Sequence, residues 1–382
     1  MARFELARMP RIVGGKGSRA EAGPLAAAMV PAGALALLVV DPGLKSTGLG
    51  DEVAASLKAA GLGVSTFSDF TGDPTVAQVD AAADVARSSG ASVVVSLGGG
   101  SALDLGKAVA AIASASASAL VYQLCETPFP ARRLPSVVIP TTSGTGSEAT
   151  RTAIVTRADK AKVWLWGDEI KADAVILDPE ATLSLPPMLT AWTGIDALVH
   201  ALEAATNANA TAANNVAAHE AIRLATTMLE RAVANGRDLE ARAAMQRAAM
   251  LGGAAIDNAG TAAGHMIGHA LGSLKPVHHG RAVALGMVAT LSWNIVEDDG
   301  RFAAAAKAMG LPDAAALPKA FADLCRSVGI KLSLAEEFAD ISAETLAAQF
   351  ARPENAAMRN SNRRKIGERD LIAFAETLLA QG

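Results

Sequence analysis

Four of the chain's six histidines lie in one short stretch, "GHMIGHALGSLKPVHHG" (264–280). They are His265 and His269, four residues apart, and the doublet His278 and His279. Residues four apart lie on the same face of a helix, so the first two imidazoles can act together. A chain that uses histidine so sparingly elsewhere concentrates its imidazole nitrogens here, which favours a chemical role for this stretch over simple packing.

A second stretch, "TGIDALVHALEA", adds a carboxylate and a further imidazole, Asp196 and His200, again four residues apart. Several imidazoles with one carboxylate suit Fe²⁺ or Zn²⁺ and suit Ca²⁺ or Mg²⁺ poorly. The sequence therefore predicts a transition-metal site. It is not the H-E-x-x-H site of metalloproteases, because residue 266 is Met and no glutamate follows His265. Hydrolysis is accordingly disfavoured.

Two glycine-rich turns form the second chemical signal. In "SLGGGSALDLGKAVA" (96–110) a strand runs into Gly98 and Gly99, and a helix follows at Ser101, with Asp104 near its start as a further candidate for cofactor binding. Glycines allow close approach of a ligand, and the free N–H groups of a helix start favour a pyrophosphate. The full G-x-G-x-x-G fingerprint is absent, because residue 103 is Leu. A tight turn without a ligand remains the alternative.

The other turn, "PTTSGTGSE" (140–148), also follows a predicted strand, and its hydroxyl groups can donate to phosphate or ribose oxygens. Its candidate residues are Thr141, Thr142, Thr145 and Ser147. Ligands of parallel sheets bind at the carboxyl ends of the strands, so the two turns together predict a dinucleotide site. An ordinary solvated loop is the alternative for this turn.

Asp41 ends the first predicted strand, in "VVDPG". A carboxylate at this point can accept hydrogen bonds from a ribose diol and would repel a 2′-phosphate, which would favour NAD over NADP. Asp-Pro-Gly is equally typical of a plain turn, so both interpretations stay open from the chemistry of this residue alone.

The elements that must position these residues differ between the two halves of the chain. Apolar runs at 34–41, 62–70, 91–100 and the start of 134–149 predict buried strands, and the helices between them are expected at 46–60, 73–90 and 101–115. Continuous apolar strands that alternate with helices indicate a parallel sheet covered on both faces, a Rossmann-like α/β domain.

The pattern changes near Pro187, where "SLPPMLTAW" interrupts the chain. Beyond it we expect an all-helical region, with helices at 190–206, 213–233, 239–257, 260–273, 280–296, 301–309, 315–328 and 369–380. We therefore predict two domains, a dinucleotide-binding α/β domain over 1–187 and a helical metal-binding domain over 188–382.

Composition excludes several other classes of protein. The formal net charge is −4 and the basic residues are scattered, so a nucleic-acid partner is not expected. Two cysteines 200 residues apart, Cys125 and Cys325, give no disulfide framework and favour the reducing cytoplasm. The first residues lack the pattern of a signal peptide, and no run reaches the roughly 18 apolar residues of a membrane span.

Together these motifs resemble the iron-dependent (group III) alcohol dehydrogenase family over nearly the whole chain. The resemblance rests on "GGGSALDLGKAVA", "PTTSGTGSEAT", "ILDPEATLSLPPMLTAWTGIDALVHALEA" and "GHMIGHALGSLKPVHHGRAVALG". It implies a dehydroquinate synthase-like architecture and an NAD-linked enzyme that transfers hydride between a small alcohol and nicotinamide, or reduces the aldehyde. It further implies Fe²⁺, with Zn²⁺ as the alternative metal, and a homodimer or larger homo-oligomer.

The resemblance also assigns residues. It implies that Asp196, His200, His265 and His279 are the metal ligands and that His278 is only their neighbour. It places His269 near the nicotinamide and the substrate, where it is a candidate for relaying the alcohol proton. The positions that match the family's dinucleotide contacts are Asp41, Gly98, Gly99, Ser101, Thr141, Thr142, Ser147 and Lys162. The family pattern at Asp41 favours NAD over NADP.

Three alternatives remain in view. A maleylacetate reductase-like oxidoreductase resembles this family but lacks the full ligand set, which is present here. A dehydroquinate synthase-like cyclase needs several basic residues for a phosphorylated substrate, and the stretch near the histidines offers only Lys275 and Arg281. A non-catalytic metal- or nucleotide-binding scaffold is the third.

Overall fold

A computed structural model describes residues 4–334 and 336–380 of the chain. The chain divides into two compact units. The sheet unit comprises Arg8–Thr142 and Gly146–Leu185, and the helical unit contains the described residues from Pro186 onward together with Ser143–Thr145. The turn that the sequence analysis singled out at 140–148 thus contributes residues to both units.

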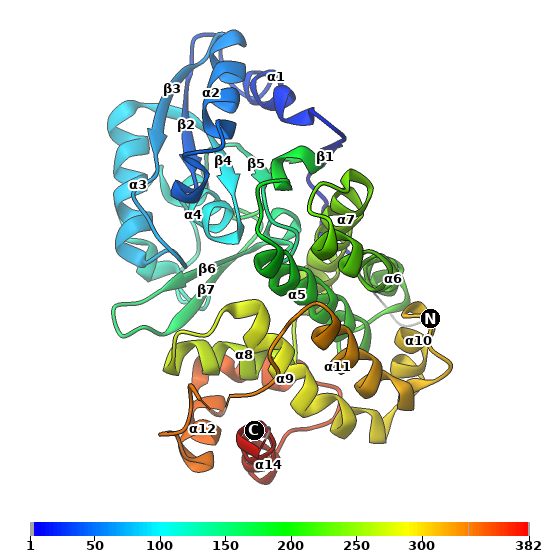
Figure 1. Cartoon of the computed structure of the whole chain (residues 1–382). Helices are drawn as coiled ribbons and strands as arrows, with labels where there is room; N and C mark the ends of the chain where they lie inside the picture. Colours follow the sequence, from blue (N-terminus) through cyan, green and yellow to red (C-terminus); the bar gives the residue numbers. More distant parts are fainter. Residues whose placement is uncertain (1–3, 335, 381–382) are drawn as a thin grey trace. The chain divides into compact units, whose positions relative to one another are not determined.

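The sheet unit is built on a six-stranded sheet with the strand order β1-β8-β5-β4-β2-β3, in which every neighbouring pair is parallel (Figure 1). Its strands are β1 (Arg11–Gly14), β2 (Leu35–Val40), β3 (Gly63–Phe67), β4 (Ala91–Gly98), β5 (Ser136–Pro140) and β8 (Ala174–Leu177). The four strands predicted from apolar runs are β2 to β5. The two others, β1 and β8, are four residues long and were not predicted, although β8 (AVIL) is itself a short apolar run.

Helices cover both faces of this sheet because successive side chains of its strands enter different cores. In β2, Ala36 and Leu38 pack with helices α1 (Ala22–Ala27) and α2 (Leu49–Ala59). Leu37 and Val39 of the same strand pack with α3 (Val76–Ser89) and α4 (Gly100–Ile112). Burial on both sides explains the continuous apolar strand sequences. The predicted parallel α/β fold is confirmed.

An antiparallel hairpin, for which the sequence analysis predicted no strands, adds to the core on the α4 side. It consists of β6 (Thr152–Thr156) and β7 (Lys162–Trp166). Alternate residues such as Ala153, Val155 and Leu165 are buried against α4. The hairpin therefore fixes the chain that leaves the 140–148 turn.

The helical unit contains the helices expected beyond Pro187, each within a few residues of its predicted bounds (Figure 1). They are α5 (Pro187–Thr206), α6 (Ala212–Ala234), α7 (Leu239–Ala259), α8 (Ala263–Leu274), α9 (His279–Asn294), α10 (Arg301–Ala308), α11 (Leu317–Ser327) and α14 (Glu368–Ala380). Two short helices, α12 (Ala343–Phe350) and α13 (Ala356–Ser361), were not predicted.

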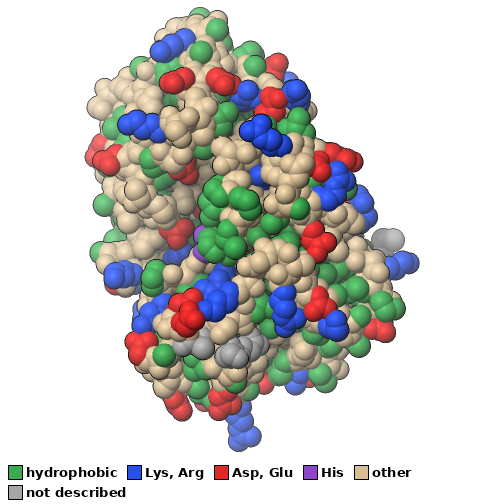
Figure 2. Space-filling model, viewed as in Figure 1, with side chains coloured by type: hydrophobic (Ala, Val, Ile, Leu, Met, Phe, Trp, Pro, Cys, Tyr) green, Lys and Arg blue, Asp and Glu red, His purple; other side chains and the backbone are tan. Residues whose placement is uncertain are grey.

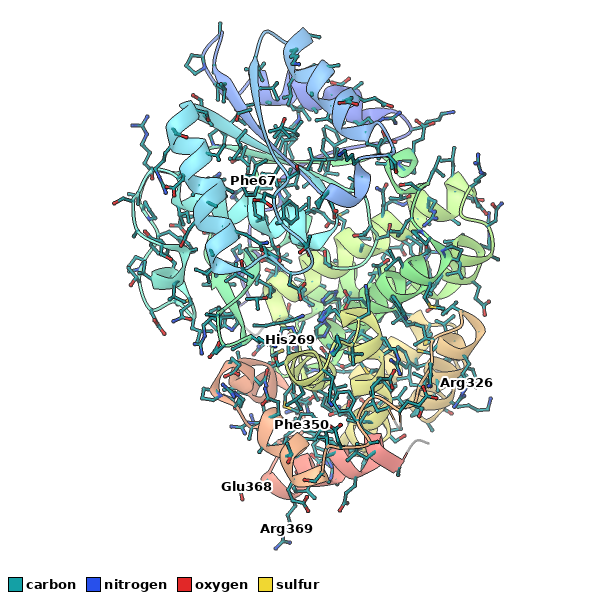
Figure 3. The ribbon with its side chains drawn as sticks, turned by 60° about the vertical axis from the view of Figure 1, so that its left-hand side comes forward. Phe67, His269, Arg326, Phe350, Glu368 and Arg369 are labelled. Atoms are coloured by element: carbon teal, nitrogen blue, oxygen red, sulfur yellow. The ribbon has the colours of Figure 1, made fainter. Side chains whose placement is uncertain are left out.

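Two apolar cores support this unit. One joins α5, α6, α7, α10 and α11, and the other joins α8, α9, α12 and α14. Phe350 lies inside the second core, whereas Arg326, Glu368 and Arg369 point outward (Figure 3). Since residues of α9 contribute to both cores, this helix and its first residue, His279, are held from two sides.

Charged side chains of both signs are interspersed on the face shown in Figure 2. That face lacks the single-sign basic field typical of nucleic-acid binding. Among the described residues, no helix has both the length and the apolar character needed to cross a membrane.

Candidate functional site

Helix α5 carries a stripe of buried polar side chains. Asp196, His200 and Glu203 lie at positions i, i+4 and i+7, and each is at most 5 % exposed. This spacing keeps all three on one helix face. Burial of polar groups is costly unless they have partners, so the stripe needs partners from neighbouring helices.

Two of these partners are histidines from α8 and α9. His265 Nε2 lies 3.5 Å from Asp196 Oδ1, and His279 Nε2 lies 3.6 Å from the same oxygen. In a tetrahedral site with bonds of 2.1 Å, ligand atoms are about 3.4 Å apart. Asp196, His265 and His279 therefore form a group whose ligand atoms, all within 4.8 Å of one another, can bind one divalent ion.

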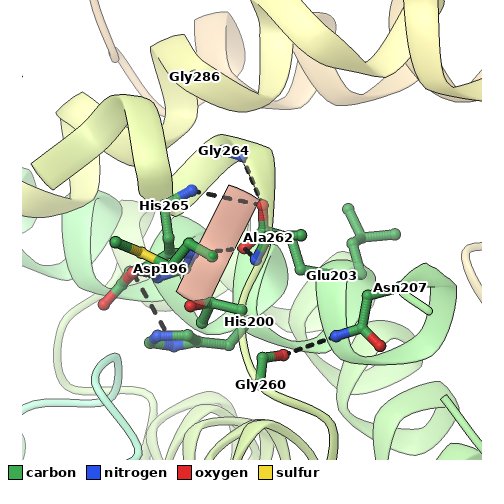
Figure 4. A network of polar contacts seen from close by, with 12 residues as sticks. Asp196, His200, Glu203, Asn207, Gly260, Ala262, Gly264, His265 and Gly286 are labelled. Carbon is green, nitrogen blue, oxygen red and sulfur yellow. Dashed lines mark hydrogen bonds and ion pairs between the residues drawn. The ribbon is translucent and has the colours of Figure 1, made fainter. Parts of the chain in front are cut away.

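His200, the fourth predicted ligand, adjoins this group. Its Nδ1 lies 3.9 Å from Asp196 Oδ1, and its ring stacks on that of His265 with centroids 4.4 Å apart (Figure 4). A ring nitrogen also hydrogen-bonds the Gly144 backbone. The structure thus brings three predicted ligands into one group and places the fourth beside it, and a set of four ligands stays a prediction.

The hydrogen bonding of these residues is incomplete in a way that suits a metal. Within 4–334 and 336–380, the buried atoms Asp196 Oδ1, His200 Nδ1 and His265 Nε2 lack a well-formed hydrogen bond. Buried polar atoms are normally satisfied, so three orphaned atoms around one point call for a missing partner. A cation that accepts their lone pairs would satisfy all three, and the carboxylate–imidazole set suits iron or zinc.

The electrostatics of the group follow from burial and mutual contact. Burial raises the pKa of Asp196, but the imidazoles of His200, His279 and His265 outweigh it and hold this pKa below its usual range. Burial lowers the pKa of His200 to about 4, so this ring is neutral at pH 7. Burial also lowers the pKa of His265, but the Glu203 and Asp196 carboxylates outweigh it and raise this pKa to about 9.

These pKa values give a prediction for metal uptake. Without metal, His265 holds a proton up to about pH 9, and a cation must displace that proton to bind Nε2. Raising the pH removes the competitor, so the affinity for Zn²⁺ should rise about tenfold per pH unit between pH 6.5 and 8.5. Competition titrations with a chromophoric chelator, corrected for the chelator's own protonation, measure this slope. An affinity that stays constant over this interval would contradict the prediction.

Sequence reasoning missed Glu203, whose carboxylate contacts the His265 ring directly. Glu203 Oε2 lies 2.7 Å from His265 Nδ1 (Figure 4). The signal was available, because Glu203 lies seven residues after Asp196 and therefore on the same face of α5.

The two remaining histidines of the 264–280 stretch differ in their contacts. His269, half-buried on α8, has its ring centroid 5.4 Å from that of His279 and 6.3 Å from that of His265 (Figure 3). His278 caps α9, where its Nδ1 accepts a hydrogen bond from the Gly280 N–H, and its ring stacks on Trp192. His278 thus has a structural use of its own, and its expected place beside the ligands stays a prediction.

The first glycine turn lies in the sheet unit, at the carboxyl ends of three neighbouring strands. Asp41 N donates to Leu97 O, and Thr141 N donates to Gly98 O, so the ends of β2, β4 and β5 are joined. Gly98 has φ +154°, and a Cβ there would lie 2.6 Å from Ala102 Cβ and 2.7 Å from Asp41 Cβ. Only glycine fits this close approach.

A hollow of about 270 Å³ opens beside this turn. Its lining consists of Asp41, Pro42, Gly43, Phe70, Thr71, Gly72 and Ser101. Asp41 Oδ1 accepts a hydrogen bond from Gly43 N at 2.9 Å, so this residue does serve its turn. Two predicted cofactor residues, Asp41 and Ser101, thus line one recess at the carboxyl ends of the strands, where ligands of such sheets bind.

Asp104 and Ser147, two further predicted cofactor residues, are buried against each other. Ser147 Oγ donates to Asp104 Oδ1 at 2.5 Å, and Ile154 N donates to Oδ2 at 2.9 Å. Lys107 Nζ lies 3.3 Å from Asp104 Oδ1. Since both carboxylate oxygens have internal partners, the geometry favours a positioning part for Asp104 over direct contact with a ligand.

The other predicted cofactor residues differ in their surroundings. Gly99 precedes α4, and a Cβ there would lie 3.2 Å from Thr142 Cγ2, so these two residues adjoin. Lys162 begins β7, where its Nζ pairs with Asp73 at 2.6 Å. Lys162 is therefore half-buried, and its charge is paired with a carboxylate that lies just before α3.

A parallel α/β sheet and a carboxylate–imidazole metal group are the features of a metal-dependent enzyme. Comparisons with known proteins agree with this class. Residues 10–179 match the family described as iron-containing alcohol dehydrogenase, and residues 190–379 match the C-terminal part of the Fe-containing alcohol dehydrogenase family. The chain belongs to the iron-containing alcohol dehydrogenase family.

Individual relatives differ in what they are named for. The chain is 39% identical to a choline dehydrogenase of Bacillus subtilis (strain 168) over 279 residues, 72% of this chain and 69% of the relative. It is 32% identical to a 1,3-propanediol dehydrogenase of Klebsiella pneumoniae over 357 residues, 90% of each chain. The crystal structure of a sulfoacetaldehyde reductase from Bifidobacterium kashiwanohense in complex with NAD+ is similar with a TM-score of 0.89 and 28% identity, covering 100% of both chains.

This membership confirms the predicted family, the predicted fold and an oxidoreductase of the alcohol dehydrogenase type with iron as its metal. The domain boundary at Pro187 and the roles of the individual site residues stay predictions.

Proposed function

We propose that this chain interconverts small alcohols and their aldehydes with NAD, and that Asp196, His200, His265 and His279 hold the iron. The observation that supports it most is the approach of three imidazoles to one carboxylate oxygen, Asp196 Oδ1, at 3.5 to 3.9 Å. Bound iron supplies a Lewis acid for the alcohol or carbonyl oxygen, and NAD supplies the hydride acceptor.

The chain's own residues then orient the reactants and move the proton. Gly98 and Gly99 allow the dinucleotide's pyrophosphate to approach the start of α4, with Ser101, Thr141, Thr142, Ser147 and Lys162 as further contacts. Asp41 accepts hydrogen bonds from the adenosine ribose. His269, half-buried beside His279, takes up the alcohol proton during oxidation and returns it during reduction.

An activity assay on the purified full chain tests this function. The protein is loaded with Fe²⁺ without oxygen and mixed with NAD and a panel of small primary alcohols, including choline and 1,3-propanediol. The reverse reaction is assayed separately, with sulfoacetaldehyde and NADH. We expect a net change in NADH absorbance that a chelator abolishes. Net NADH formation also separates this function from a cyclase, which regenerates its NAD. No change with any alcohol or aldehyde, with Fe²⁺ or Zn²⁺, would refute the proposal.

Asp41 should set the preference between the two nicotinamide cofactors. Replacing it by Gly removes a negative charge that repels the 2′-phosphate of NADP, so the ratio of kcat/KM for NADP to that for NAD should rise about tenfold or more, or roughly 1.4 kcal/mol. Steady-state kinetics with both cofactors measure the ratio.

Asp41→Asn is the matched control, because its amide oxygen can still accept the hydrogen bond from Gly43. We expect this variant to show most of the shift, since it too removes the charge. If neither variant changes the preference, Asp41 is only a turn residue.

We also propose a cytoplasmic location and a homodimer or larger assembly. Free Cys125 and Cys325 support a reducing compartment. Exposed apolar side chains near the beginning of the chain, on Phe4, Leu6, Met9 and Ile12, support a protein partner such as a second copy.

A further inference from the structure

Glu203 is a buried carboxylate that belongs to no predicted ligand set, yet it has four donor contacts. Its Oε1 accepts from Gly264 N at 2.6 Å and from His265 N at 3.4 Å. Its Oε2 accepts from Ala262 N at 2.8 Å and lies 2.7 Å from His265 Nδ1 (Figure 4). The side chain is only 4% exposed, so these protein donors replace the water that would otherwise solvate the carboxylate.

The backbone contacts explain how α8 begins. Its N-cap residue, Ala262, has no side chain that can accept from the first N–H groups, and Glu203 of α5 takes that part from outside the helix. Gly264 permits this approach, because a Cβ there would lie 2.9 Å from Glu203 Oε1. Glu203 therefore fixes the helix end that carries His265.

The ring contact adds a chemical consequence. An imidazole whose Nδ1–H donates to a carboxylate keeps its lone pair on Nε2, and the carboxylate raises the ring's basicity as a ligand. His265 Nε2 is the atom that lies 3.5 Å from Asp196 Oδ1. Glu203 thus selects the tautomer of His265 that directs its lone pair into the candidate metal centre.

We propose that Glu203 is a positioning residue for the metal centre, which keeps a proton on His265 Nδ1 so that Nε2 is the ring nitrogen that binds the cation. This inference rests on the proposed metal centre. It predicts a loss of metal affinity from a residue that never touches the metal.

Glu203→Gln tests the contact with nearly the same side-chain shape. Every partner of Glu203 is a donor, so the amide NH₂ group of glutamine has no acceptor except His265 Nδ1. Donation to Nδ1 would move the ring proton to Nε2 and block it as a ligand. We therefore expect the affinity for Zn²⁺ to fall about 10- to 100-fold, as for other residues that orient a ligand.

Asn207, the C-cap residue of α5 four residues after Glu203, offers a matched control. Its Nδ2 donates to Ala259 O and Gly260 O, both at 2.9 Å, and so fixes the same connection between α7 and α8 without touching His265 (Figure 4). Asn207→Ala loosens this connection and leaves the ring contact in place, so its Zn²⁺ affinity should stay close to that of the unaltered chain.

The experiment measures Zn²⁺ affinity of the full chain and both variants by competition titration, and the histidine ring N–H signals of the Zn²⁺-loaded, ¹⁵N-histidine-labelled proteins by NMR. We expect a low-field ring N–H signal in the unaltered chain and in Asn207→Ala, and its loss in Glu203→Gln together with the fall in affinity. If Glu203→Gln does not fold, Glu203→Asp, which is one methylene too short to keep the contact, must show the same losses.

Unchanged affinity in the Glu203 variant, or an equal fall in Asn207→Ala, would overturn the proposal while leaving the metal centre intact. Failure of the unaltered chain to bind Zn²⁺ at all would overturn the metal centre and this proposal together.

Discussion

Replacing His265 by Ala is expected to remove the metal from the purified protein and to lower kcat/KM for alcohol oxidation by at least about 1,000-fold. The variant loses one of the ligand atoms around Asp196 Oδ1 and leaves Glu203 without its ring partner. A Lewis acid contributes several kcal/mol to stabilising charge in the transition state, and each 1.36 kcal/mol is a factor of ten in rate.

Metal content by elemental analysis and steady-state kinetics with added Fe²⁺ check this result. His219→Ala is the matched control, since it removes the same side chain from α6, outside the candidate centre, and should keep metal and activity. Circular dichroism shows whether the helices persist in both variants. Full activity in His265→Ala would refute its assignment as a ligand.

The sequence allowed prediction of the elements whose signals are local. Strands β2 to β5 are continuous apolar runs because both faces of the sheet are covered, and the long helices from α5 onward repeat their apolar residues at helical spacing. A metal site was predictable for a similar reason, because Asp196 with His200, and His265 with His269, share helix faces. The coming together of α5, α8 and α9 depends on tertiary packing; the scarcity of histidine only hinted at it, and His279 was assigned as a ligand through the family resemblance.

Features that depend on long-range partners were not predictable. The place of Glu203 on the same face of α5 as Asp196 follows from its spacing, but its capping of a helix that begins 60 residues later is recorded by no local pattern. The β6–β7 hairpin is stabilised by burial against α4, and α12 by the core around Phe350, and neither signal is strong within its own few residues. Asp104, predicted as a cofactor residue from its place after the glycines, has internal partners for both carboxylate oxygens, and the long-range ones, Ser147 and Ile154, leave no local signal.

Replacing Lys107 by Met should destabilise the sheet unit strongly. The side chain is fully buried, and its Nζ donates to Ser147 O at 2.7 Å and Thr152 O at 2.6 Å, besides pairing with Asp104. Methionine has a similar length but no donor, so two carbonyl groups and a buried carboxylate lose their charged donor. Breaking a buried pair from one side costs about 3–5 kcal/mol, which corresponds to a fall in Tm of roughly 10 °C for a unit of this size.

Calorimetry of the metal-loaded protein measures this change, and Lys58→Met, on the exposed side of α2, should stay within about 0.5 kcal/mol. The double variant Asp104→Asn with Lys107→Met should be less destabilised than the sum of its parts, because burial already raises the pKa of Asp104 and only Lys107 opposes this with a full charge. Asp104→Asn alone should likewise lower Tm. If this variant instead weakens NAD binding at an unchanged Tm, Asp104 contacts the cofactor directly. Its hydrogen bonds with Ser147 and Ile154 would then not be the reason for its stabilising role.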